Sequence, residues 1–265
     1  MIDLLSSMIL LMLLAIGALA WLSVGRAARP SYARVDRLVE GVLLGRGAAT
    51  AGYWALQPIA RGLARAGVSA DAVTMASLPL AATSGVAFAT GHYGGGALFA
   101  ALAFACDAID GLVARATGTA SEAGEVIDSA VDRACESSIY LGLALGWRDS
   151  LPLLALVLAA SAGAQHVTLA SAKAEVYARG PLHLAVPGGS MRRPERAMVL
   201  VLGSAASGVL LCFSTSRALA LTPLAVALTG IAVIANTSAL SRFRSLAAAL
   251  RAHKTTTREV SHAGH

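Results

Sequence analysis

Long apolar blocks separated by short polar stretches are the feature that most constrains the fold of this chain. Seven such blocks lie at about residues 4–23, 72–91, 95–114, 124–145, 151–172, 197–215 and 219–240. Each is close to the ~20 residues that a helix needs to cross a bilayer core of about 30 Å. Mean hydropathy is +0.67, and 14% of the residues are charged, against about a quarter in soluble domains. The sequence therefore predicts an all-α polytopic membrane helix bundle.

The first apolar block resembles a signal peptide in length, with small residues at Ala18 and Ala20. Its leading segment, however, carries Asp3 and no basic residue, and the positive charges follow the block at Arg26 and Arg29. A secretory signal has the opposite arrangement. We therefore expect an uncleaved N-terminal transmembrane helix, added to a six-helix core.

A basic stretch joins this helix to the core. Pro58 is suited to open a short helix and Gly67 to end it, and Tyr53 and Trp54 suit the headgroup level. We expect this juxtamembrane helix to lie in the membrane interface. The predicted organisation is an N-terminal transmembrane helix (1–25), a cytoplasmic basic linker with the juxtamembrane helix (26–70), a membrane domain (71–242) and a cytoplasmic polar tail (243–265). Within this tail we expect the last dozen residues, from Lys254, to lack fixed structure.

The distribution of basic residues predicts the orientation. The net charge is +6, and nearly all Lys and Arg fall on one side of the seven predicted spans; only Arg148 and Arg217 fall on the other. Cytoplasmic loops carry the excess of basic residues. We expect a multi-pass protein of the cell inner (plasma) membrane, and no nucleic-acid partner, because the charges alternate with spans and form no separate basic domain.

Four aspartates lie where two predicted spans meet on the cytoplasmic side. Asp107 and Asp110 are three residues apart, and Asp128 and Asp132 are four apart, so each pair shares one helix face. A short turn between antiparallel helices directs both pairs at one volume. Carboxylates this close require compensating cations, and an all-oxygen ligand set favours Mg²⁺, Mn²⁺ or Ca²⁺ over zinc.

Small residues and one arginine accompany the aspartates. Gly111 and Gly124 permit close approach to the backbone, and Arg115 is suited to bind a phosphate. Together with a metal these features describe a diphosphate site. The alternative is a set of interfacial salt bridges to Arg115 and Arg133.

The motif resembles the signature of the CDP-alcohol phosphatidyltransferases, D-x2-D-G-x2-A-R-x8-G-x3-D-x3-D. All eight positions match, at Asp107, Asp110, Gly111, Ala114, Arg115, Gly124, Asp128 and Asp132. The similarity covers about residues 55–240. It implies a six-helix catalytic core with its site open to the cytoplasm, and members of the family are commonly homodimers.

The resemblance also implies the roles of the residues. Asp107, Asp110 and Asp128 would hold the metal, and Asp132 would share metal binding with general-base duty. The residues implied to bind CDP are Gly111, Ala114, Arg115 and Gly124. Asp71 and Thr74 match the family's stretch before its first core helix, where nucleotide contact, helix capping by Asp71 and packing of Thr74 remain open.

The acceptor is less clearly marked. Lys173, Arg193 and Arg196 lie at the cytoplasmic level and are suited either to bind an acceptor phosphate or to act as membrane anchors. The R-P-E-R and K-A-E runs are similar to actinobacterial phosphatidylinositol phosphate synthases, although Ser171 stands where that subfamily usually has lysine. The expected activity is transfer of a phosphatidyl group from CDP-diacylglycerol to a small polar alcohol such as inositol phosphate, with release of CMP.

Three alternatives stay open. The acceptor can instead be glycerol 3-phosphate, serine or inositol. The same motif also suits transfer from a soluble CDP-alcohol to a lipid. Outside the family, buried carboxylates suit a cation-coupled transporter, although such acids usually lie near the bilayer midplane.

Overall fold

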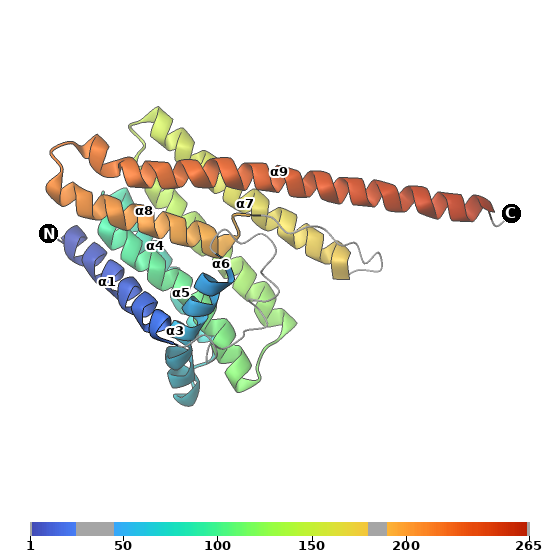
Figure 1. Cartoon of the computed structure of the whole chain (residues 1–265), viewed down its shortest axis with the longest axis horizontal. Helices are drawn as coiled ribbons and strands as arrows, with labels where there is room; N and C mark the ends of the chain where they lie inside the picture. Colours follow the sequence, from blue (N-terminus) through green and yellow to red (C-terminus); the bar gives the residue numbers. More distant parts are fainter. Residues whose placement is uncertain (1, 25–44, 180–189, 264–265) are drawn as a thin grey trace.

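The structure is a computed structural model that describes residues 2–24, 45–179 and 190–263. Within these ranges the secondary structure is helical, without strands, and the helices form one bundle (Figure 1). They are α1 (Ile2–Ser23), α3 (Gly45–Arg65), α4 (Ala70–Ala89), α5 (Tyr93–Thr117), α6 (Glu122–Gly146), α7 (Leu151–Arg179), α8 (Arg193–Phe213) and α9 (Arg217–Ala263). The predicted all-α bundle is confirmed.

Six of the described helices are long and apolar enough to cross a membrane: α1, α4, α5, α7, α8 and α9. The seventh predicted span, α6, fails this criterion because it carries several acidic residues. Yet α6 runs parallel to α4, with Ser77 beside Cys135 near the middle of both helices and Phe88 beside Gly146 at their C-terminal ends. Because α6 accompanies α4 over this length, it crosses the same thickness of the bundle, and its polar residues are tolerated where they face protein.

Glycines set the separation of α4 and α6. A Cβ atom added at Gly85 would lie 2.6 Å from the carbonyl oxygen of Ser138, and one added at Gly142 would overlap the backbone of Gly85. At the end of α6, a Cβ at Gly146 would lie 2.5 Å from the carbonyl oxygen of Phe88. Such close backbone approach is typical of membrane helices, whose association depends on packing of small residues. This packing fixes α6, and with it the second pair of aspartates.

The N-terminal helix α1 packs on α5 and α8. The Asp3 carboxylate accepts hydrogen bonds from the backbone nitrogens of Gly94 and Gly95 at 3.0 and 3.2 Å, and it lies 3.0 Å from His92 Nδ1. Asp3 therefore compensates unpaired N–H groups and the positive dipole at the start of α5. In this way α1 is joined to the helix that carries Asp107 and Asp110.

Two helix boundaries differ from the sequence predictions. Pro58 lies inside α3 instead of opening it, because the helix begins at Gly45; alanines and Leu56 before the proline favour helix strongly enough to continue through it. Helix α9 continues to Ala263, past the predicted end of the last span and into the predicted unstructured tail. The alanine-rich sequence from residue 247 to 252 has high helix propensity, and Figure 1 shows α9 extending well beyond the other helices.

The predicted end of the juxtamembrane helix is confirmed. Helix α3 ends at Arg65, and Gly67 adopts a left-handed conformation with φ of 76°. The Gly67 nitrogen donates to Ala64 O, and the Val68 nitrogen donates to Leu63 O. This is the usual glycine termination of a helix.

The glycine contact between α4 and α6 yields a first prediction. We expect Gly142→Ala to lower the stability of the detergent-solubilised protein by about 1–3 kcal/mol, because the added methyl group meets backbone and not a mobile side chain. The control is Gly230→Ala on α9, where nothing lies within 4 Å of the added Cβ. Thermal unfolding of both variants is the measurement, and equal melting temperatures would contradict the close approach.

Candidate metal and nucleotide site

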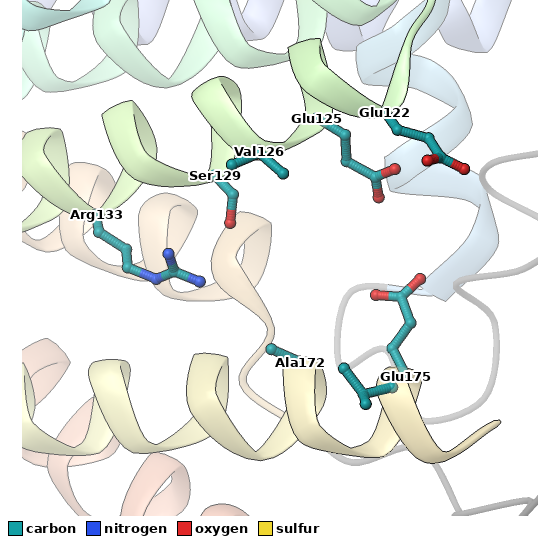
Figure 2. Close-up of a pocket in the computed structure, with 8 residues that line it drawn as sticks. Glu122, Glu125, Val126, Ser129, Arg133, Ala172 and Glu175 are labelled. Carbon is teal, nitrogen blue, oxygen red and sulfur yellow. The ribbon is translucent and has the colours of Figure 1, made fainter. Parts of the chain in front are cut away.

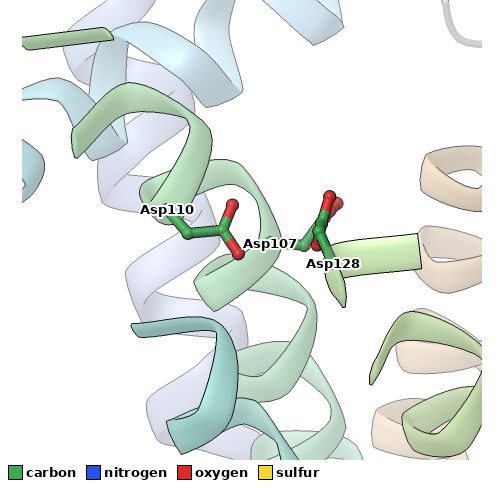
Figure 3. A group of neighbouring side chains, drawn as sticks. All are labelled: Asp107, Asp110 and Asp128. Atoms are coloured by element: carbon green, nitrogen blue, oxygen red, sulfur yellow. The ribbon is translucent and has the colours of Figure 1, made fainter. Parts of the chain in front are cut away.

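Three of the four aspartates form a group that could hold a metal ion. Ligand atoms of Asp107, Asp110 and Asp128 all lie within 4.8 Å of one another. Figure 3 shows the Asp110 carboxylate directed from α5 toward Asp107 and Asp128. Asp110 is buried and the other two are half-buried. The antiparallel arrangement expected from the spacing of the acids thus brings α5 and α6 together at one volume.

Arg193, in the first turn of α8, bridges Asp107 of this group to Asp132, the fourth aspartate. Its Nη1 atom lies 2.8 Å from Asp107 Oδ2 and 2.6 Å from Asp132 Oδ2. The guanidinium carbon also lies 5.5 Å from the ring centroid of Phe104, within range of a cation–π interaction. The structure therefore places Arg193 against the aspartates, in contact with Asp132.

Thr74 joins α4 to the acidic cluster. Its hydroxyl oxygen is 2.7 Å from Asp110 Oδ2 and 3.1 Å from the carbonyl oxygen of Ala70. A hydroxyl has one proton, so it donates either to the carboxylate or to the carbonyl. Thr74 thereby orients Asp110, in addition to any contact with nucleotide.

Asp71 does not cap α4, so of the two roles considered for it, helix capping and nucleotide contact, the first is wrong. The N-cap is Ser69, whose Oγ accepts a hydrogen bond from the Ala72 nitrogen at 3.2 Å. Asp71 lies exposed in the first turn of the helix. A first-turn carboxylate still interacts favourably with the helix dipole.

The other residues of the motif surround the turn between α5 and α6. Gly111 and Ala114 are half-buried on the last turns of α5, and Arg115 is exposed one residue further on. Gly124 lies in the first turn of α6, where its nitrogen donates to Ser121 Oγ at 3.1 Å. Gly118, in the turn itself, has φ of 70° and ends α5. The short turn therefore keeps these residues on the same side of the bundle as the aspartates.

The three residues expected to bind the acceptor are not equivalent. Lys173 is exposed on α7, and Arg193 is bound to Asp107 and Asp132. Arg196 is 1% exposed, and its guanidinium donates to Glu136. Of the three, Lys173 is exposed, Arg193 is half-buried and Arg196 is enclosed.

A pocket of about 490 Å³ opens between α6 and α7. Figure 2 shows polar side chains of both helices directed toward it. Its lining residues are Glu122, Glu125, Val126, Ser129 and Arg133 of α6 and Ala172, Glu175 and Val176 of α7. The pocket lies beside the helix face that carries Asp128 and Asp132. The spacing of the four aspartates in the sequence did not predict this pocket.

The donor set suits a hard divalent cation. Carboxylate oxygens are the ligands that Mg²⁺ and Mn²⁺ prefer. Three carboxylates converge here. The guanidinium of Arg193 pairs with two of the four aspartates, Asp107 and Asp132. Asp107, Asp110 and Asp128 would hold the ion, which would supply charge neutralisation and polarisation of a bound phosphate.

The sequence profile of the CDP-alcohol phosphatidyltransferase family matches residues 68–237. This is more than half of the chain, and it contains the whole eight-residue motif. The chain belongs to this family of membrane transferases.

Curated relatives give a finer comparison. Phosphatidylinositol phosphate synthase of Mycobacteroides abscessus is 33% identical over 156 residues, covering 57% of this chain and 68% of the relative. The enzyme of the same name from Streptomyces avermitilis is 30% identical over 189 residues, covering 70% and 73%. Archaetidylinositol phosphate synthase of Pyrococcus horikoshii is 35% identical over 100 residues, covering 37% and 48%.

Solved structures share the fold. Phosphatidylinositol phosphate synthase of Mycobacterium tuberculosis with CDP-DAG bound has a TM-score of 0.60 and 26% identity, over 71% of this chain and 92% of that one. The same enzyme in complex with manganese and citrate also has a TM-score of 0.60, over 71% and 87%. Members that resemble this chain thus bind a CDP-lipid in one structure and manganese in another.

The acidic cluster predicts a metal-dependent gain in stability. We expect Mn²⁺ to raise the melting temperature of the wild type, because at 100 times the dissociation constant it adds about 2.7 kcal/mol to the free energy of unfolding. Asp107→Asn and Asp128→Asn should lose most of this shift, because each removes one ionised ligand. The measurement is thermal unfolding with and without Mn²⁺.

The matched control is Asp149→Asn. This residue has a side chain that is 92% exposed, and it lies at the opposite end of α6 from the cluster. It should keep the full Mn²⁺ shift. Equal shifts in all four proteins would place the metal elsewhere.

Proposed function

We propose that this protein transfers the phosphatidyl group of CDP-diacylglycerol to the hydroxyl of an inositol phosphate and releases CMP. The observation that carries the proposal is the meeting of Asp107, Asp110 and Asp128 at the α5–α6 turn, in a family whose donors are CDP-alcohols. The acceptor is inferred from the relatives, which are named as phosphatidylinositol and archaetidylinositol phosphate synthases.

The donor would bind at the turn between α5 and α6. Gly111, Ala114 and Gly124 present little side chain, so a diphosphate can approach the backbone, and exposed Arg115 can neutralise a phosphate oxygen. The lipid tails would then lie among the apolar helices. Mg²⁺ or Mn²⁺, held by the aspartates, would bridge the diphosphate and disperse the charge that develops on it.

Asp132 is the proposed general base. Its carboxylate would accept the proton of the acceptor hydroxyl, whose oxygen forms a bond to the lipid-side phosphorus. The bond from that phosphorus to the oxygen bridging to CMP breaks, and CMP leaves with the electron pair. For this role Asp132 must exchange its ion pair with Arg193 for a hydrogen bond to the acceptor.

Arg193 and Lys173 are the proposed contacts for the acceptor phosphate. Once the aspartates are neutralised by a divalent cation, the Arg193 guanidinium is available to pair with an anion beside Asp132. Lys173 is exposed on the neighbouring helix, and basic residues at the inner interface attract anionic groups in any case. These contacts would distinguish a phosphorylated acceptor from free inositol or serine.

The proposed setting is the cytoplasmic side of the cell inner membrane. Among the described residues, the basic side chains concentrate at the end of the bundle that bears the aspartates, as the positive-inside rule requires for a cytoplasmic face. A homodimer is proposed from the family, with each protomer carrying a complete set of aspartates.

The proposal predicts strict donor and acceptor requirements. Purified protein with Mn²⁺ and CDP-diacylglycerol should release CMP with inositol phosphate, and much more slowly with inositol, serine or glycerol 3-phosphate. Asp132→Asn should lower kcat by roughly 10²–10⁴-fold, because it removes the base. Asp149→Asn should keep wild-type kcat.

The outcome of the acceptor series decides between the alternatives. Fastest turnover with glycerol 3-phosphate, serine or inositol would reassign the acceptor within the family. Release of CMP only from a soluble CDP-alcohol, with diacylglycerol as acceptor, would reverse the direction of transfer. No CMP release from any donor would refute the proposed function.

A further inference from the structure

We infer that Arg196 and Glu136 are positioning residues that hold α6 and α8 at a fixed separation, so that Asp132 keeps its place when Arg193 releases it. This inference rests on the proposed function for its effect on turnover. It gives Arg196 a role different from the acceptor contact expected from the sequence.

The geometry of the pair is that of a bidentate ion pair. Arg196 Nε donates to Glu136 Oε1 at 2.9 Å, and Nη2 donates to Glu136 Oε2 at 2.9 Å. Arg196 is 1% exposed and Glu136 is 4% exposed. A two-pronged, charge-assisted pair of this kind restricts both distance and orientation.

Arg196 also contacts two further elements. Its Nη1 donates to the carbonyl oxygen of Met191 at 2.7 Å, and Nη2 lies 3.4 Å from Thr168 Oγ1 of α7. Met191 has φ of 59°, a conformation that costs energy in a residue with a side chain. One guanidinium thus joins α6, α7 and the segment that leads into α8. Because its Nε, Nη1 and Nη2 atoms all bond to groups inside the protein, the Arg196 guanidinium is not accessible to a ligand.

The position of this pair links it to the reaction. Glu136 lies one turn beyond Asp132 on α6, and Arg196 lies one turn beyond Arg193 on α8. The two arginines therefore make two successive bridges between the same helices. In the described part of the chain α6 and α8 do not pack backbone against backbone, so these side chains span the space between them.

The Arg193–Asp132 and Arg196–Glu136 ion pairs behave differently in the proposed reaction. Asp132 must leave Arg193 to accept a proton, so the outer bridge opens. The inner bridge, between Arg196 and Glu136, is more deeply buried and contacts no proposed substrate. Of the two bridges between α6 and α8, it is the one that still holds Asp132 near the residues of α8.

The direct test uses variants that keep size but lose the paired geometry. We expect Arg196→Lys and Glu136→Gln each to lower kcat by about 10- to 100-fold, with KM for the acceptor within about twofold of wild type, because a small displacement of a reacting group has effects of this size. The chemical control is Arg244→Lys on α9, which changes an exposed arginine. The acceptor control is Lys173→Gln, which should raise acceptor KM.

A measurement without substrate separates this inference from the proposed function. Binding of Mn²⁺, followed by the electron paramagnetic resonance signal of the free ion, should weaken by about tenfold or more in Arg196→Lys, because displaced carboxylates ligate less well. Wild-type protein that binds Mn²⁺ but releases no CMP would refute the proposed function alone. Unchanged Mn²⁺ affinity together with unchanged kcat would refute the positioning role.

A double variant distinguishes positioning from a purely structural role. Replacing one partner leaves a buried unpaired charge, whereas replacing both with apolar residues generally restores stability. We expect Glu136→Met/Arg196→Met to recover the melting temperature lost in Arg196→Met, while kcat stays low. Recovery of kcat with the melting temperature would show that the pair only stabilises the fold, and a raised acceptor KM confined to the Arg196 variants would show an acceptor contact.

Discussion

The need to compensate four carboxylates at one end of a membrane helix bundle governs much of this structure. Charged groups in such surroundings are costly unless they are paired or bind a cation. Asp107, Asp110 and Asp128 lie within ligand distance of one another, and Arg193 contacts Asp107 and Asp132. The guanidinium thus supplies part of the positive charge that these carboxylates require.

The rest of the bundle serves to hold α5 and α6 in this relation. Close glycine packing at Gly85 and Gly142 brings α6 against α4, and Thr74 connects α4 to Asp110. On the other side, Asp3 of α1 binds the first turn of α5. The added N-terminal helix is therefore joined to the helix that carries two of the aspartates, although it lies outside the family match.

Local patterns in the sequence were sufficient for part of the account. Spacings of three and four residues predicted that each aspartate pair shares a helix face, and the apolar blocks predicted the helices. The Pro58 signal misled because propensity around it favoured a longer helix. Glu136 was missed, although its position four residues after Asp132, inside a largely apolar segment, was a usable signal that it has a buried partner.

Other features depend on contacts between distant segments. Arg193 reaches Asp107 across more than eighty residues of sequence, and no local pattern distinguishes its ion pair from a role in acceptor binding. The same is true of Arg196, whose partner lies on another helix. Only the arrangement of α6, α7 and α8 shows that one arginine lies against the aspartates and the other is enclosed.

We expect the aspartates of α5 and α6 to form a cation site from which Arg193 can be displaced. Anomalous diffraction from crystals soaked in Mn²⁺ tests this most directly. We predict a manganese peak bounded by Asp107, Asp110 and Asp128, with the Arg193 guanidinium moved away from Asp107. A peak elsewhere, or no peak while Arg193 still bridges Asp107 and Asp132, would contradict it.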